Sequence, residues 1–96
     1  MDYFDNLDCK SLFFEVQEAL FYDDVIDIDI ILGIAAERGC DITPRYVAIM
    51  AMETNAYNVI LDMVYRGVSP SYLINEANKR GYHYVADMLR SSISSS

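Results

Sequence analysis

The sequence has no tryptophan and is poor in the residues that catalytic and metal sites need, with one histidine and two cysteines. Cys9 and Cys40 stand far apart without a CxxC spacing, and His83 is the single histidine. Because the cysteine and histidine ligands of a structural zinc site are missing, we expect no metal. In an intracellular chain the two cysteines are expected to be buried thiols.

Long hydrophobic runs are also absent. The best candidate, 25–36, is interrupted by Asp27 and Asp29 and falls short of the roughly 18–20 residues that span a bilayer. No basic region precedes an apolar stretch at the N-terminus, so we expect no signal peptide. A hydrophobic share of 53% is too high for a disordered chain. We therefore expect one small cytoplasmic domain with no membrane partner.

The common catalytic motifs GxGxxG, GxxxxGK[ST], GxSxG and HExxH are missing. His83 lies between two tyrosines beside an expected turn, which favours a helix-surface residue over a general base. Asp27 and Asp29 would lie about 200° apart on a helix and would not share a site. We therefore expect no enzymatic activity, no catalytic residue and no cofactor.

Basic residues are scarce, with seven against fifteen acidic ones and a net charge of −8. Residues 1–41 hold eleven acids and two bases, a balance of −9, whereas residues 42–96 hold four acids and five bases, a balance of +1. The acidic half repels phosphate and attracts basic surfaces, so direct nucleic-acid binding is not expected. The alternative is that the acids serve only to keep an apolar domain soluble.

What the sequence does contain is an internal repeat, because residues 43–64 and 69–90 nearly superimpose. Thr43-Pro44-Arg45-Tyr46-Val47 returns as Ser69-Pro70-Ser71-Tyr72-Leu73, and Ala51, Asn55 and Val59 return as Ala77, Gly81 and Val85. A repeat period in this range is typical of stacked helical arrays. It favours a recognition function over a catalytic one.

Apolar periodicity and cap residues predict an all-α fold of six helices in three antiparallel pairs, about 9–39, 43–67 and 69–92, with a frayed tail at 93–96. Thr43 and Ser69, each followed by proline, open helices, and Asn55 is a turn residue that tolerates positive φ. One pair cannot bury its apolar face alone, so the three are expected to stack. The expected inner faces include Leu12, Val16, Ala19, Leu20, Val47, Met50, Ala51, Thr54, Tyr82, Val85, Ala86 and Leu89.

The segment Val25–Leu32 allows two interpretations. Its alternating isoleucine and aspartate fit a strand with one solvated face. A helical stripe of Ile26, Ile30, Ile31 and Ile34 also fits, followed by the good helix formers 35–38 and a glycine stop at Gly39. We prefer the helix because no second strand is available for pairing.

With the helices placed in this way, the chain resembles ankyrin-repeat proteins over about 12–92. Residues 51–55 are similar to the end of that family's first helix, and residues 55–67 are similar to its second helix and terminating glycine. Residues 77–81, with Val85 and Leu89, are similar to the same elements again. Residues 34–42 are similar to the end of an earlier second helix and its loop. The resemblance implies a short solenoid that binds proteins. A single residue, Val68, separates Gly67 from Ser69, so the β-hairpin finger of the family is not expected.

Tyrosine is abundant, with eight residues, and it suits interfaces because it combines apolar area with one hydroxyl. Tyr46 and Tyr72 occupy equivalent repeat positions and predict a ladder along one face. Tyr57, Tyr82 and His83 lie near expected helix–helix turns and predict a second row. The alternative is that these tyrosines only cover the edges of a small core.

We therefore expect a small intracellular protein–protein interaction module that acts as an inhibitor or adaptor of viral or phage origin. Its binding surface would combine the tyrosines and His83 with Asp23, Asp24 and Asp27 of the acidic first pair. One alternative is an acidic decoy that mimics nucleic acid and blocks a DNA- or RNA-binding protein. Another is a structural subunit that self-associates through its isoleucine-rich helix.

Overall fold

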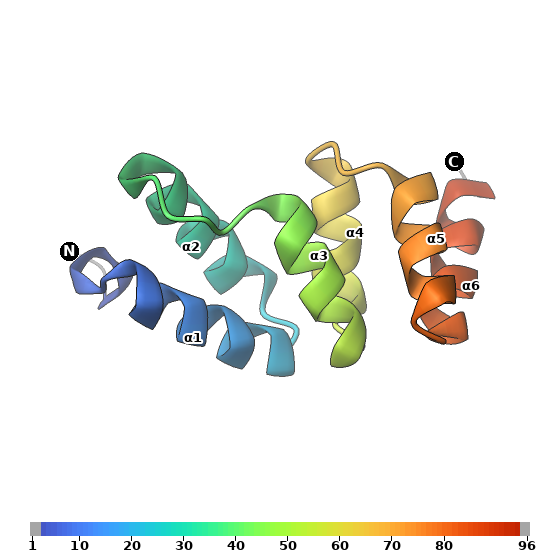
Figure 1. Ribbon diagram of the computed structural model, residues 1–96, viewed down its shortest axis with the longest axis horizontal. Helices are drawn as coiled ribbons and strands as arrows, with labels where there is room; N and C mark the ends of the chain where they lie inside the picture. Colours follow the sequence, from blue (N-terminus) through green and yellow to red (C-terminus); the bar gives the residue numbers. More distant parts are fainter. Residues whose placement is uncertain (1–2, 95–96) are drawn as a thin grey trace.

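The computed structural model describes residues 3–94, which form a 3₁₀ turn and six α-helices (Figure 1). The elements are η1 (Tyr3–Asn6), α1 (Cys9–Phe21), α2 (Val25–Arg38), α3 (Pro44–Glu53), α4 (Tyr57–Tyr65), α5 (Pro70–Lys79) and α6 (His83–Ser94). No strand occurs in this part of the chain, and the helical prediction for Val25–Leu32 is confirmed. Helix α6 includes positions 93 and 94, which the sequence assigns to a frayed tail, while 95 and 96 lie outside the described residues.

Local sequence signals open α3 and α5 as predicted. The hydroxyls of Thr43 and Ser69 accept hydrogen bonds, each 3.2 Å long, from the backbone N–H groups of Tyr46 and Tyr72. Proline follows each cap at the start of the helix, where the missing N–H leaves no hydrogen bond unmade. The starts of these two helices are therefore encoded by the same short motif.

The helices pack in pairs, α1 with α2, α3 with α4 and α5 with α6. Neighbouring pairs meet through α1 and α3, through α2 and α4, and through α3 and α5. In Figure 1 the pairs follow one another along the long axis of a molecule that measures 40 × 24 × 21 Å. The acidic first pair and the third pair therefore lie at opposite ends.

The turns inside the three pairs, 22–24, 54–56 and 80–82, have the same geometry. Their middle residues, Asp23, Asn55 and Gly81, adopt left-handed backbone conformations with φ of 51°, 56° and 80°. Each turn follows a buried alanine whose carbonyl accepts a hydrogen bond from the last turn residue, at 2.9, 3.0 and 2.8 Å for Ala19, Ala51 and Ala77. The first pair therefore belongs to the same repeat, which the sequence comparison detected only in the second and third pairs.

The core is apolar, and among residues 4 and 6–93 no polar or charged side chain is buried. Equivalent positions of the second and third pairs are buried together, as the repeat predicts. Their members are Val47 and Leu73, Ala51 and Ala77, Val59 and Val85, Ile60 and Ala86, and Met63 and Leu89. The predicted inner face of α1, Leu12, Val16, Ala19 and Leu20, is also confirmed.

The inward side of α2 differs from the predicted stripe. Ile26 is 73% exposed and Ile30 is half-buried, whereas the buried residues are Ile28, Ile31, Leu32, Ile34 and Ala35. Isoleucines occur around most of this helix, so their spacing does not determine its rotation. Packing against α1 and α4 selects the rotation. In α3, similarly, Met50 is half-buried and Thr54 is exposed, while Ala48 and Met52 are buried instead.

Candidate protein-binding surfaces

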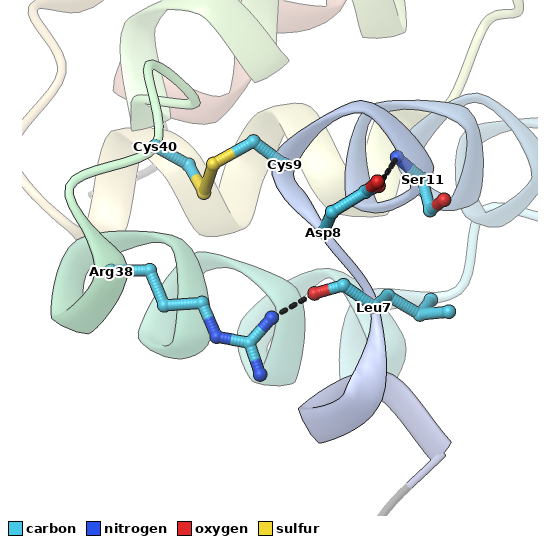
Figure 2. Close-up of a disulfide and its surroundings, with 6 residues drawn as sticks. All are labelled: Leu7, Asp8, Cys9, Ser11, Arg38 and Cys40. Atoms are coloured by element: carbon cyan, nitrogen blue, oxygen red, sulfur yellow. Dashed lines mark hydrogen bonds between the residues drawn. A yellow bond between two sulfur atoms is a disulfide. The ribbon is translucent and has the colours of Figure 1, made fainter.

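Cys9 and Cys40 form a disulfide, which corrects the prediction of two buried thiols (Figure 2). Helices α1 and α2 have nearly equal lengths, 13 and 14 residues, so pairing brings the start of α1 to the end of α2. The two Cα atoms are 5.5 Å apart, within the range of native disulfides. Cys9 is exposed and Cys40 is half-buried. Disulfides persist mainly in oxidising compartments, and this weighs against the cytoplasmic location, which stays a prediction.

Two further interactions hold the same end of the first pair. The guanidinium of Arg38, near the end of α2, donates a hydrogen bond to the backbone carbonyl of Leu7 (Figure 2). The carboxylate of Asp8 accepts the N–H of Ser11 at 2.8 Å and caps α1. This hydrogen bond lowers the pKa of Asp8. The entry of the chain into α1 is therefore bound to the exit of α2 by both covalent and polar links.

An apolar groove of about 580 Å³ opens beside the disulfide. Phe13 and Tyr46 form part of its wall with ring centroids 5.6 Å apart, and Phe14 is exposed at its side. Lys10 and Asp41 supply one charge of each sign. Tyr46, predicted to bind a partner, therefore lies in a concave apolar site and is itself half-buried.

Asp23 joins the first pair to the second. Its carboxylate accepts the backbone N–H groups of Asn58 and Val59 at 3.2 and 3.0 Å, and the side-chain amide of Asn58 at 2.9 Å. Helix α4 begins after Ala56, which has no side chain that can cap it. A residue of the preceding repeat therefore satisfies the free N–H groups at the start of α4.

Arg66 links the other end of α4 to α2. It contacts Asp29 at 2.5 Å and Asp62 at 3.3 Å. Burial opposes ionisation of Asp29, but hydrogen bonds with Asp62 and Arg66 hold its pKa below the ordinary value. Burial and the neighbouring Asp29 raise the pKa of Asp62. Asp29 and Asp27 thus point to different surroundings, as their spacing on a helix predicts.

The turn 22–24 between α1 and α2 carries an acidic corner with exposed apolar groups. Burial and the negative charges of Asp24 and Glu18 raise the pKa of Asp27. Asp24 caps α2 by accepting the N–H of Asp27 at 3.1 Å, and no ion pair involves Glu18, Asp24 or Asp27 among the described residues. Beside them, Phe21, Tyr22 and Ile26 are 73%, 70% and 73% exposed.

The helix–helix turns lie along one long edge of the molecule, the lower edge in Figure 1. We call this edge, made of the three turns and the first turn of the helix after each, the turn edge. Six of the eight predicted binding residues lie on it, namely Asp23, Asp24, Asp27, Tyr57, Tyr82 and His83. Tyr46 and Tyr72 lie instead in the first turns of α3 and α5, away from this edge, and both are half-buried. Tyr72 is covered by the Arg45 guanidinium at 4.6 Å from the ring centroid.

Sequence reasoning did not select Phe21, Tyr22, Ile26 or Tyr84, although these are among the most exposed large apolar residues. Ile26 and Tyr84 occupy the same repeat position, three residues after the left-handed turn residues Asp23 and Gly81, and Asn58 occupies it in the second pair. All three are exposed. Extending the repeat to the first pair would have revealed this row.

Comparisons with protein-family models, with curated proteins and with solved structures find no match to this chain. None of the described helices is long and apolar enough to cross a membrane. Between positions 3 and 94, no group of three histidine, cysteine, aspartate or glutamate residues is placed to hold a metal ion.

Proposed function

We propose that this protein is a short, ankyrin-like helical-repeat module that binds another protein through its turn edge. The observation that carries the proposal is the row of equivalent positions Ile26, Asn58 and Tyr84, which present exposed side chains from three successive repeats. A repeat array holds such positions at regular intervals on a rigid frame. Exposed aromatic and aliphatic side chains next to polar ones are typical of protein interfaces.

The turns support the ankyrin-like part of the proposal. Each pair has a buried alanine, a left-handed residue four positions later and the same backbone hydrogen bond from the last turn residue to the alanine carbonyl. The connections between pairs, 39–43 and 66–69, are short and leave no room for a β-hairpin finger. Binding by this module is therefore assigned to the turn edge.

The acidic-decoy alternative receives less support from the surface. Three of the acids that motivate it, Asp8, Asp23 and Asp24, cap helices, and Asp29 is paired with Arg66. These four carboxylates therefore serve the fold itself, and their presence needs no nucleic-acid-binding partner to explain it. Of the other acids, Glu18 and Asp27 lie beside the turn 22–24, next to exposed apolar groups, which suits a mixed protein interface better than a uniform mimic of phosphates.

Site-specific photocrosslinking tests the proposed function. A photoreactive phenylalanine analogue is placed at position 26, 58 or 84 and, as the control, at Tyr65, which is 90% exposed at the far end of α4. We expect the three edge positions to cross-link to the same protein, and position 65 not to do so. Equal cross-linking from position 65, or none from the edge, would contradict the proposal.

A further inference from the structure

The corner at the turn 22–24 combines three exposed apolar side chains with carboxylates that form no ion pair within the described part of the chain. We call Glu18, Phe21, Tyr22, Ile26 and Asp27 the first-turn corner. Phe21 and Tyr22 stack edge to face with ring centroids 5.1 Å apart, so their exposed surfaces form one aromatic unit. On a small soluble protein such a protrusion, flanked by charge of one sign, marks an interaction site.

The electrostatic surroundings of the corner are negative from both helices. Glu18 belongs to α1 and Asp27 to α2, and the two influence each other together with Asp24. Asp23 and Asp24, in the turn that joins these two helices, are also acidic and are engaged in capping. The basic residues Arg38 and Arg66 are engaged elsewhere, with Leu7 and with Asp29 and Asp62. The corner therefore keeps an uncompensated negative potential next to exposed rings.

We infer that the first-turn corner binds a basic amphipathic segment of a partner protein, with apolar side chains on Phe21, Tyr22 and Ile26 and lysine or arginine beside Glu18 and Asp27. This inference rests on the proposed function and names the chemistry of the partner at one end of the turn edge. Charge complementarity selects it, because basic groups gain from the field of the carboxylates and apolar groups gain from burial of the rings.

Two other occupants fit the corner less well. A second copy of this chain, bound corner to corner by a two-fold axis, would place the same carboxylates against each other. The net charge of −8 also opposes self-association. An anionic membrane surface would be repelled by the same groups. Only a partner that carries positive charge next to apolar side chains satisfies both halves of the site.

Nuclear magnetic resonance titration tests the inference with two defined probes. One is an amphipathic helical peptide made of leucine and lysine, and the other is its leucine–glutamate counterpart. We expect the leucine–lysine peptide to shift the backbone signals of Phe21, Tyr22 and Ile26 and to bind at least about tenfold more tightly than the counterpart, because like charges repel the latter. Its affinity should fall as salt is added.

Three variants separate the apolar from the charged half of the corner. The double variant Y22S/I26S should weaken binding of the leucine–lysine peptide by about tenfold through lost burial. The double variant E18Q/D27N should weaken it severalfold at low salt and reduce the salt dependence. The matched control Tyr65→Ser, which removes an exposed tyrosine from α4, should change neither value.

The results can also overturn the inference. Equal binding of the two peptides, or shifts centred on Phe13, Phe14 and Tyr46 in the groove, would contradict it, and so would equal losses in the corner variants and Tyr65→Ser. A concentration-dependent dimer with the same shifts would assign the corner to a second copy. If the peptides miss the corner while the edge positions still cross-link to one protein, only this inference fails. If cross-linking comes from position 65 instead, the proposed function fails.

Discussion

Asp23 meets two demands at a single position. Its backbone is left-handed, with φ of 51°, a conformation that aspartate and asparagine tolerate better than most residues. Its carboxylate caps α4, the helix of the next repeat. Asn55 has the equivalent backbone conformation, with φ of 56°, and its side chain makes no hydrogen bond to another residue that the structure describes. The two positions therefore allow the cap to be separated from the turn.

Replacing each residue by glycine tests this separation. Asp23→Gly keeps the left-handed turn but removes the acceptor for two N–H groups, and we expect the free energy of unfolding to fall by about 1–2 kcal/mol. Asn55→Gly should change it by less than about 0.5 kcal/mol, because glycine accepts this conformation without strain. Urea denaturation measures both. A loss at Asn55→Gly as large as that at Asp23→Gly would show that the cap contributes nothing.

The raised pKa of Asp27 predicts a pH dependence. The pKa of this carboxyl group is higher in the folded state than the ordinary 3.8. As pH rises past the ordinary and the raised pKa, the protein therefore loses stability, because the folded state then holds an unfavourable charge. Asp27→Asn should therefore raise stability at pH 7 by less than about 1 kcal/mol, since the site is partly solvated. The gain should disappear near pH 3.

Denaturation at both pH values measures this effect. Asp41→Asn, in the exposed loop between α2 and α3, makes the same change of net charge away from the acidic corner. A pH-independent gain at Asp27, or the same gain at Asp41, would contradict the assigned cause.

At the scale of elements, the first pair is closed at both ends. The disulfide and the hydrogen bond from Arg38 to Leu7 hold one end, and the tight turn 22–24 forms the other. The second and third pairs rely on their turns and on packing. The acidic first pair, in which like charges accumulate, is thus also the pair with the covalent link.

Removing the disulfide should lower the free energy of unfolding by about 3–4 kcal/mol, the loop-closure value for a bond that closes 31 residues. Denaturation of the wild type with and without a phosphine reductant, and of the double variant C9S/C40S, measures this. Because Cys9 is exposed, the reductant should destabilise the wild type. It should leave the variant unchanged. Equal stability of the oxidised wild type and the variant would show that the link does not constrain the unfolded chain.

At the scale of the whole molecule, the links between neighbouring pairs differ. The first and second pairs share the Asp23 cap, the ion pair between Arg66 and Asp29, and a hydrogen bond from the hydroxyl of Thr54 to the Leu20 carbonyl. The third pair meets the second through α3 and α5, and Arg45 lies over the ring of Tyr72. In a repeat protein, stability depends on such nearest-neighbour interfaces.

We therefore expect the third pair to open at a lower free energy than the first two. Native-state hydrogen exchange should show that buried amides such as Leu73 and Leu89 exchange through an opening below global unfolding, while Ile31 and Ile60 need global unfolding. Arg45→Ala should speed exchange in α5 more than in α2. Identical opening free energies at all four amides would show that the array unfolds as one unit.

Short-range signals made much of the fold predictable. These signals are the caps at Thr43 and Ser69, the left-handed turn at Asn55, the apolar face of α1 and the positions Val85, Ala86 and Leu89 of α6. Each depends on residues within a few positions of each other, and each is confirmed, whereas Tyr82, predicted to belong to the last face, is half-buried. The rotation of α2 was missed because isoleucines occur around the helix. Phe21, at the end of α1, and the turn-edge residues Tyr22 and Tyr84 were missed because local patterns do not reveal which apolar side chains stay uncovered.

The amino-acid sequence by itself determined the helices, their breaks and the second and third repeats, because these follow from periodicity, capping and backbone preference over short stretches. Tertiary structure alone decided three matters. It joined Cys9 to Cys40, it directed the carboxylate of Asp23 to a helix of the next repeat, and it left Ile26 in solvent. Each depends on how whole helices lie against one another, and the energy that sets this arrangement is summed over the entire packed core.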